Sequence, residues 1–242
     1  MLGIIIPTYN EKENIFKLSN RLIKLYPNSK IFIVDDTKNY NLNDYFKKNK
    51  KITYIYRKNK KGRGSAVIEG FKRAIKDNKI KFFVEMDADF SHKPEELGKN
   101  LKIFKNRKLD LLVSSRYLNN SKIYNWSIQR RVFSFLANFL AKLLLNVGVS
   151  DYTNGYRMYS KKALKIVVSK CGKIGDGFIV LSEILLQINM KNLKIDETSS
   201  IFVNRKRGES SVNFLLICQS FFGLLKLVLI KNKIINPYKK YK

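Results

Sequence analysis

Two groups of aspartates in this 242-residue chain each follow a short apolar run. Asp35–Asp36 comes directly after Ile31–Val34, and Asp87 and Asp89 follow Phe82–Met86. The chain has only 19 acidic residues, so their placement at the ends of two predicted buried strands is informative. Ligands of open parallel sheets bind at the carboxyl ends of strands, where paired carboxylates suit Mg²⁺ or Mn²⁺ together with phosphate oxygens. The pattern favours such a site over solvated turn aspartates.

Two further segments contain residue types that bind nucleotides and phosphates. Pro7–Glu11 reads P-T-Y-N-E, in which a tyrosine ring can cover a nucleobase and a carboxylate can accept from base or ribose donors. The alternative is that Asn10 caps the helix that follows. Lys60–Ser65 reads K-K-G-R-G-S and opens a predicted helix, where glycines and a helix N-terminus suit a phosphate. Because it matches neither a P-loop nor G-x-G-x-x-G, a basic turn is an equal alternative.

The first half of the chain alternates between strand and helix patterns. Short apolar runs predict strands at Leu2–Ile6, Ile31–Val34, Phe82–Met86 and Leu111–Ser114, and Ile52–Tyr56 alternates like a strand. Helical spacing lies between them, at Asn10–Tyr26, Gly64–Ile75 and Glu95–Phe104. This order predicts an α/β fold with a mainly parallel central sheet, which brings the strand-end aspartates to one edge.

The second half is mainly helical. Helix patterns cover Ile128–Asn146, Lys161–Ser169, Phe178–Met190 and Phe214–Ile230, and Leu193–Val203 is strand-like. In the first of these helices a polar stripe recurs every four residues among apolar side chains, at Arg130, Ser134, Asn138, Lys142 and Asn146. Such a stripe suits a phosphate headgroup beside a hydrocarbon chain; the alternative is an ordinary amphipathic core helix.

Composition narrows the classes of protein. Apolar residues make up 45% of the chain, which excludes disorder for most of it. The net charge of +29 suits phosphorylated substrates or anionic lipid, but the lysines are spread along the chain and coding bias explains them equally well, so no nucleic-acid partner is inferred. Two cysteines cannot form a disulfide framework. The single histidine, His92, makes a histidine metal site or a Ser-His-Asp triad improbable, and we expect it to be structural.

Together these segments resemble a known family. Pro7–Glu11, Val34–Asp36, Gly62–Ala66 and Met86–Pro94 match, in order and spacing, a family 2 glycosyltransferase of GT-A fold. Three further stretches narrow the resemblance to the dolichol-phosphate mannose synthase (polyprenol monophosphomannose synthase) branch, over about residues 1–212: Ser114–Tyr117, Gln129–Arg131 and Asn204–Ser210.

The resemblance implies a role for each matching residue. The nucleotide sugar would be held by Pro7, Tyr9, Glu11, Val34, Asp36, Asp87, Ala88, Asp89, Arg116 and Arg205. Asp87 and Asp89 would bind Mg²⁺ or Mn²⁺, and Arg130 and Ser134 the phosphate of the lipid acceptor. The groups implied in catalysis are Asp89, Arg116, Arg130 and Arg205.

Several positions depart from the family pattern. Thr37 follows the aspartate pair, where the family has a small or amide residue, and Arg63 stands in the middle of its G-L-G. Ser211 replaces an expected lysine, so that phosphate contact is missing or comes from Lys206 or Arg207. Asp151–Arg157 takes the place of a D-L-T-x-x-F-R run. These departures bear on the donor sugar more than on the reaction class.

The implied reaction is the inverting, metal-dependent transfer of mannose from GDP-mannose to dolichyl or polyprenyl phosphate. A phosphate monoester is mostly ionised at neutral pH, since its second pKa is about 6, and needs no general base. The alternatives are a UDP-sugar donor, such as UDP-glucose, or a different glycan acceptor, which would need a base such as Asp151. A non-catalytic binder of anionic membranes or nucleic acid, or an inactive relative, is the remaining possibility.

We expect residues 1–211 to form the catalytic domain and residues 212–242 an apolar amphipathic helix with a basic tail. One side of that helix has the more polar residues Gln219, Ser220, Gly223 and Lys226, which favours an interfacial helix over a spanning one. The alternative is a core helix that caps the domain. The first residues lack the basic region of a signal peptide. The expected location is therefore the cytoplasmic face of a membrane, peripheral or monotopic, with or without a membrane-anchoring partner protein.

Overall fold

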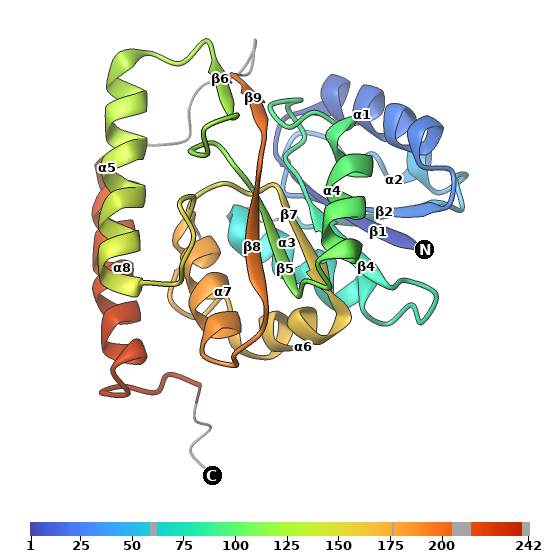
Figure 1. Ribbon diagram of the computed structural model, residues 1–242. Helices are drawn as coiled ribbons and strands as arrows, with labels where there is room; N and C mark the ends of the chain where they lie inside the picture. Colours follow the sequence, from blue (N-terminus) through green and yellow to red (C-terminus); the bar gives the residue numbers. More distant parts are fainter. Residues whose placement is uncertain (59–61, 176, 205–213, 239–242) are drawn as a thin grey trace.

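A twisted sheet of seven strands forms the centre of the molecule (Figure 1). The computed structural model describes residues 1–58, 62–175, 177–204 and 214–238. The strands lie in the order β3-β2-β1-β4-β7-β5-β8. Their bounds, in the same order, are Ile52–Tyr56, Ser29–Asp35, Leu2–Thr8, Phe82–Glu85, Arg157–Ser160, Leu111–Ser115 and Ile195–Ser199. All adjacent pairs are parallel except the two that involve β7, which confirms the expected mainly parallel α/β sheet.

Alternating side chains of the central strand feed two separate cores. In β1, Ile4 and Ile6 pack with α1 (Lys12–Leu25), α2 (Asn43–Phe46) and α4 (Glu96–Asn106) on one face. Ile5 packs on the other face with α3 (Arg63–Ala74), α6 (Lys161–Lys170) and α7 (Ile179–Asn189). Every residue of β1 is buried, as expected for a strand with helices on both sides.

Two local features differ from the expected elements. Asn10 does not cap α1: its φ is 58°, the N-cap position is Glu11, and the Asn10 amide donates to the Thr37 hydroxyl at 2.8 Å. The segment Leu193–Val203 forms two strands rather than one, because the chain leaves the main sheet at Ser200. The second of them, β9 (Ile201–Val203), pairs in parallel with β6 (Lys122–Tyr124) in a small separate sheet.

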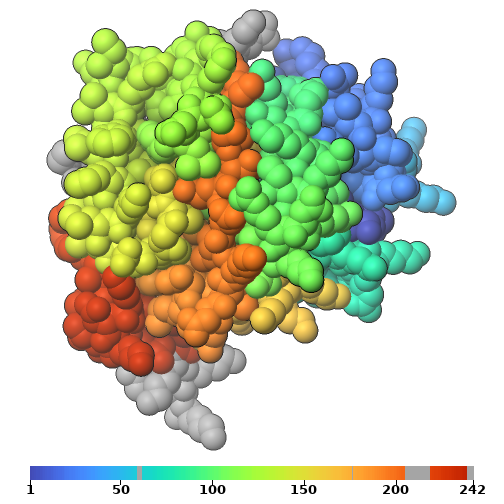
Figure 2. All heavy atoms as spheres, in the orientation of Figure 1, coloured from blue at the N-terminus to red at the C-terminus, as the bar shows by residue number. Residues whose placement is uncertain are grey.

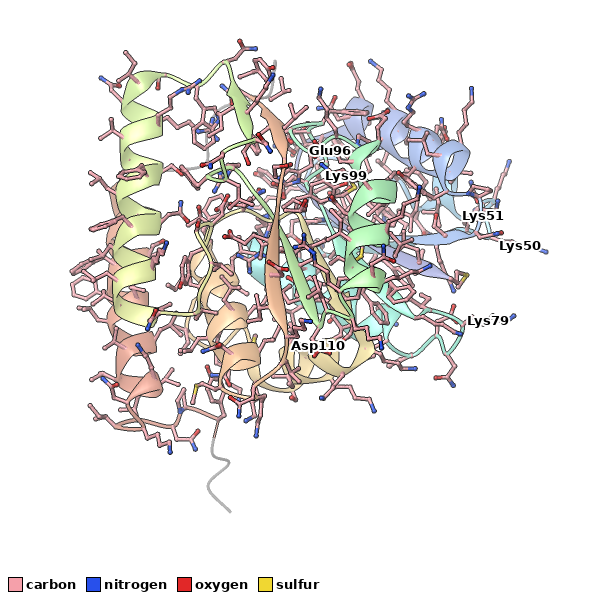
Figure 3. All side chains as sticks on the ribbon, viewed as in Figure 1. Lys50, Lys51, Lys79, Glu96, Lys99 and Asp110 are labelled. Carbon is pink, nitrogen blue, oxygen red and sulfur yellow. The ribbon has the colours of Figure 1, made fainter. Side chains whose placement is uncertain are left out.

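Glu96, labelled in Figure 3, fixes that break in the strand. Its carboxylate accepts from the Ser200 hydroxyl at 2.8 Å and from the Ile201 amide at 3.0 Å. These two hydrogen bonds hold the junction of β8 and β9 at the first turn of α4. They direct β9 toward the edge of the sheet where the aspartates lie.

Two long helices lie side by side along one flank of the molecule (Figure 1). These are α5 (Ile128–Leu145) and α8 (Phe214–Lys231). The buried side of α8 joins the same core as α5 and α7, through Leu224, Leu227 and Ile230. Within the described ranges, no helix combines the length and apolar character needed to cross a bilayer.

The terminal helix is therefore part of the packed core on one side. Gly223, expected on a polar side, lies against Ile179 instead, and a Cβ there would approach the Ile179 side chain to 2.6 Å. The Lys231 ammonium donates to the Leu144 carbonyl at 3.0 Å, which joins the ends of the two long helices. The expected boundary between residues 211 and 212 lies outside the described residues, so that division stays a prediction.

Candidate functional site

The strand ends place the predicted nucleotide residues beside one another. Pro7 of β1 is paired in register with Val34 of β2, and the amide of Asp36 donates to the Thr8 carbonyl at 3.1 Å. Tyr9, the next residue along, is 40% exposed and so presents a ring at this edge. The structure thus brings Pro7, Tyr9, Val34 and Asp36 together.

The Asp36 carboxylate already has a strong partner inside the protein. It is buried and takes two hydrogen bonds from the guanidinium of Arg57, one of them 2.7 Å long. The same guanidinium donates to the Ser65 hydroxyl at 3.0 Å and to the Gly62 carbonyl at 3.2 Å. Asp36 therefore orients the start of α3. Glu11 accepts from the Asn14 side chain at the start of α1.

The turn after β4 presents the two predicted metal ligands. One oxygen of Asp89 accepts from the amide and the hydroxyl of Ser91, at 3.0 and 2.6 Å, which fixes the turn. Asp87 Oδ1 accepts from the Arg63 Nε at 2.9 Å. Both aspartates are partly exposed, whereas Ala88 between them is buried. Burial opposes ionisation of Asp87, but Arg63 and His92 outweigh it and lower the pKa of that carboxyl.

The donor set fits a hard divalent cation. Asp87 and Asp89 supply only carboxylate oxygens, the ligands that Mg²⁺ and Mn²⁺ prefer. No group of three or more histidine, cysteine, aspartate or glutamate side chains with metal-binding geometry occurs among the residues that the structure describes. Asp87 and Asp89 are therefore the residues that could hold such a cation.

His92 is fully buried and bonds to the backbone of this turn. Its Nδ1 accepts from the Asp87 amide at 3.1 Å, so Nε2 is protonated and donates to the Asn154 side-chain oxygen at 2.9 Å. The ring stacks on Tyr156 with 5.0 Å between centroids. Burial lowers the pKa of His92 below its usual value, against the charges of Asp87 and Asp89. The expected structural role is confirmed, since both ring nitrogens bond to protein groups.

Glu85 is a buried acid that sequence reasoning did not single out. It ends β4, two residues before Asp87, and neither carboxylate oxygen has a hydrogen-bond partner in the described part of the chain. Arg157, opposite it in the antiparallel ladder, gives its hydrogen bonds to backbone carbonyls. Burial, opposed by the charges of Arg63 and Arg157, raises the pKa of Glu85 to about 7.

Arg116 forms a buried ion pair with Asp151. Its Nε and Nη2 donate to the two oxygens of that carboxylate at 2.8 and 2.7 Å, and Nη2 also donates to the Thr153 hydroxyl at 2.7 Å. The guanidinium lies over the rings of Tyr117 and Trp126. Burial opposes ionisation of Asp151, but Arg116 lowers its pKa overall. A fully buried, paired carboxylate does not suit the general-base role considered for Asp151.

The predicted acceptor residues lie on the first half of α5, near Arg116. The guanidinium of Arg130 also lies over the Trp126 ring, with 4.4 Å from its carbon to the ring centroid. It donates to the Asn204 side chain at 2.7 Å. Ser134 accepts from the Tyr117 hydroxyl at 2.6 Å. Arg116, Arg130 and Ser134 are thus brought together around Trp126 and Tyr117. Arg205, together with Lys206, Arg207 and Ser211, lies outside the described residues.

The polar stripe on α5 is only partly a binding face. Asn138 is buried, accepts from the Tyr152 amide at 2.7 Å and donates to the Ser134 carbonyl at 2.7 Å. Lys142 and Asn146, one and two turns further on, are exposed. The stripe therefore holds α5 against the domain at its centre and leaves only Arg130 and Ser134 at the site.

Comparison with known proteins identifies the family. Residues 3–167 match the model of glycosyl transferase family 2. The chain is 31% identical over 214 residues to an undecaprenyl-phosphate mannosyltransferase of Micrococcus luteus, with 86% of each chain covered. The chain belongs to glycosyl transferase family 2. This glycosyltransferase is also 31% identical, over 90% of its length and 83% of the relative, to a polyprenol monophosphomannose synthase of Mycolicibacterium smegmatis.

Solved structures confirm the GT-A architecture expected for the glycosyltransferase. Glucosyl-3-phosphoglycerate synthase of Mycobacterium tuberculosis, solved with Mn²⁺, UDP-glucose and glycerol 3-phosphate, matches it with a TM-score of 0.66. The match covers 98% of this chain and 82% of that one at 14% identity. The same protein solved with Mg²⁺ and UDP gives a TM-score of 0.65. At this level of identity the likeness shows the fold alone.

The sequence pointed to the candidate site residues, but not to the side chains that bind them inside the protein. Arg57 directly follows the predicted strand Ile52–Tyr56, so its strand-end position was a usable signal. The burial of Glu85 had a signal too, because it lies inside the run Phe82–Met86 that predicts a buried strand. The pairing of Arg116 with Asp151 had none, because it depends on contacts between distant segments.

The glycosyltransferase offers a direct test of the histidine assignment. His92 is its only histidine, so the imidazole signal of ¹³C-histidine-labelled protein needs no assignment. We expect an NMR titration midpoint below the ordinary 6.5. Because the fold holds the neutral form, the stabilising contribution of His92 is present above pH 6.5 and is lost as the pH falls below it. A midpoint at or above 6.5 would contradict the assignment, since Asp87 and Asp89 would then hold an imidazolium.

A second prediction concerns the buried ion pair. Asp151→Asn leaves Arg116 buried without its counter-charge, so we expect the free energy of unfolding in urea to fall by about 3–5 kcal/mol. The matched control is Asp196→Asn, whose pair with Arg107 is exposed and should cost at most about 1 kcal/mol. Equal costs for the two variants would show that the Arg116 pair contributes nothing special to the fold.

Proposed function

We propose that this glycosyltransferase transfers mannose from GDP-mannose to the phosphate of a polyprenyl or dolichyl lipid. The names of the two curated relatives support the mannosyl group and the polyprenyl phosphate acceptor. The observation that carries the proposal is that one structure holds an acidic turn and a cationic group, each suited to one of two phosphorylated reactants. The acidic turn of Asp87 and Asp89 lies at the carboxyl edge of the sheet, and the cationic group of Arg116 and Arg130 lies at the start of an exposed apolar helix.

The chain needs no general base for this transfer. The acceptor phosphate is mostly ionised at neutral pH, since its second pKa is about 6. Arg130 and the Ser134 hydroxyl hold and orient it, and Arg116, fixed by Asp151, adds positive charge behind it. A bound Mg²⁺ or Mn²⁺, held by Asp87 and Asp89, supplies charge neutralisation for the leaving diphosphate. In-line attack by the phosphate oxygen at the anomeric carbon breaks its bond to the diphosphate and inverts its configuration.

The acceptor lipid implies a membrane surface, and the two long helices offer a face for one. The outer sides of α5 and α8 lie next to each other on the molecular surface (Figure 2). Their exposed large apolar side chains are Ile128, Val132, Phe133, Phe135, Leu136, Phe139, Leu143, Phe221, Phe222, Leu225 and Leu229. Contiguous apolar surface of this kind is rare on proteins that stay in water. With the net charge of +29, it fits the anionic cytoplasmic face of a membrane.

A UDP-sugar such as UDP-glucose is the second candidate for the donor. Nothing in the contacts of Tyr9 and Asp36 separates guanine from uracil, since Asp36 is already paired with Arg57. The mannosyl donor rests on the names of the relatives, which are far more similar in sequence than the UDP-binding solved structures.

A transfer assay tests the reaction. Purified protein with Mg²⁺ or Mn²⁺ and a short polyprenyl phosphate is given a panel of GDP- and UDP-sugars, and lipid-extractable sugar is measured. We expect metal-dependent product from GDP-mannose, and a loss of about 10²–10³-fold in turnover for Asp89→Ala and Arg130→Gln. Lys142→Gln, on an exposed turn of the same helix, is the control and should leave turnover unchanged. Product from a UDP-sugar alone would overturn the donor.

A vesicle assay tests the membrane face. Two phenylalanines on α5, Phe135 and Phe139, are each 56% exposed. Replacing both with serine should weaken binding to phosphatidylglycerol vesicles by at least about tenfold, since burying one such side chain is worth roughly 1.5–3 kcal/mol. Tyr45→Ser is the matched control, because Tyr45 is also 56% exposed but lies on α2. Equal binding by all variants would remove the α5 face from the proposal.

A further inference from the structure

Arg63 binds a carboxylate oxygen of Asp87 that a metal ion would need as a ligand. It is the first residue of α3, and its Nε and Nη2 both approach the same atom, Asp87 Oδ1, at 2.9 and 2.8 Å. Only the Nε contact has hydrogen-bond geometry, so the Nη2 contact is a charge contact. A divalent cation bound to Asp87 would face this guanidinium at short range, and like charges at such a distance in a protein interior repel strongly.

Gly155 provides the space for this arrangement. A Cβ at Gly155 would lie 1.8 Å from Nη2 of Arg63, closer than any real contact. The guanidinium therefore lies directly on the backbone of the loop that follows Asp151, and any larger residue at 155 would displace it. The loop and the first residue of α3 are matched to each other.

A second acid, Glu85, lies two residues before Asp87 at the end of β4. Glu85 is fully buried, and neither of its oxygens has a hydrogen-bond partner among the described residues. Its charge acts on Arg63 as well as on Arg157. Arg157 is committed to three backbone carbonyls, and within the described ranges the Tyr159 hydroxyl has no partner in hydrogen-bond geometry. Unpaired buried carboxylate oxygens are costly, so a donor that reached Glu85 would be stabilised there.

We propose that Arg63 is a positioning residue that holds the Asp87 carboxylate until a divalent cation binds, and that its guanidinium then moves to Glu85. This rests on the proposed function, in which Asp87 is a metal ligand. Arg63 thereby competes with the metal and weakens its binding, while Glu85 offsets that competition by accepting the displaced guanidinium. The leucine of the family pattern at this position could do neither.

Manganese binding tests the proposal without any measurement of transfer. Mn²⁺ is titrated into each variant, with and without GDP, and free Mn²⁺ is measured by EPR. Arg63→Leu removes the competitor and should bind Mn²⁺ at least about fivefold more tightly than the unaltered protein, the lower end of typical coupling between linked sites. Glu85→Gln removes the second acceptor and should bind Mn²⁺ at least about fivefold more weakly. Arg73→Leu, at an exposed position of the same helix, is the control and should bind as the unaltered protein does.

Two further variants keep the test decisive. Arg63→Leu leaves Glu85 with one cation fewer, so the double variant Arg63→Leu/Glu85→Gln removes both charges. In the proposal Glu85 acts only through Arg63. The double variant should therefore bind Mn²⁺ as tightly as Arg63→Leu alone. Arg63→Lys should keep the competition. Affinity unchanged in Arg63→Leu, or a weakening by Glu85→Gln that persists in the double variant, would overturn the role of Arg63 and leave the metal site intact. No Mn²⁺ binding by any variant, with GDP still bound, would overturn the metal assignment itself.

Discussion

One buried chain of hydrogen bonds joins the two proposed phosphate-binding centres. Asp151 binds Arg116 and accepts from the Asn154 amide at 3.0 Å, and the Asn154 side chain bonds to His92 at 2.9 Å. His92 in turn accepts from the Asp87 amide at 3.1 Å. The group around Arg116 and the acidic turn at Asp87 are therefore parts of one hydrogen-bonded network. In the proposed reaction, this network would set the distance between the acceptor phosphate and the anomeric carbon of the donor.

Such a network stabilises the fold only when it is complete, because a buried charge without its partner costs far more than the pair contributes. Arg116 and Asp151 satisfy each other, and His92 is kept neutral with both nitrogens bonded. Among the described residues, the buried oxygens of Glu85 have no hydrogen-bond partner, and the same holds for the Trp126 Nε1 and the Tyr159 hydroxyl. Buried groups of this kind call for an explanation, and for Glu85 the proposed movement of the Arg63 guanidinium supplies one.

The strands that carry the site were predictable because each has its own signal. Each of the strands β1 to β5 contains a short, mainly apolar run, and the aspartates stand at or just beyond the ends of two of them. The strand β7 was missed because it has only four residues, runs against its neighbours, and passes straight into α6 at Lys161. The break at Ser200 was missed because a bond to Glu96, more than a hundred residues away, makes it. Pairing over such separations leaves no local pattern.

The helix α5 connects the site to its proposed surroundings. Residues four apart share a face of a helix, so Arg130, Ser134 and Asn138 turn inward together while the phenylalanines between them turn outward. A helix with its side chains is about 10 Å across, so the two faces are separated by no more than that. A polyprenyl phosphate has its hydrocarbon in the bilayer and its charge at the surface. In the proposed reaction, the helix that rests on the membrane thus also sets the depth of the acceptor phosphate, and the membrane acts as one wall of the site.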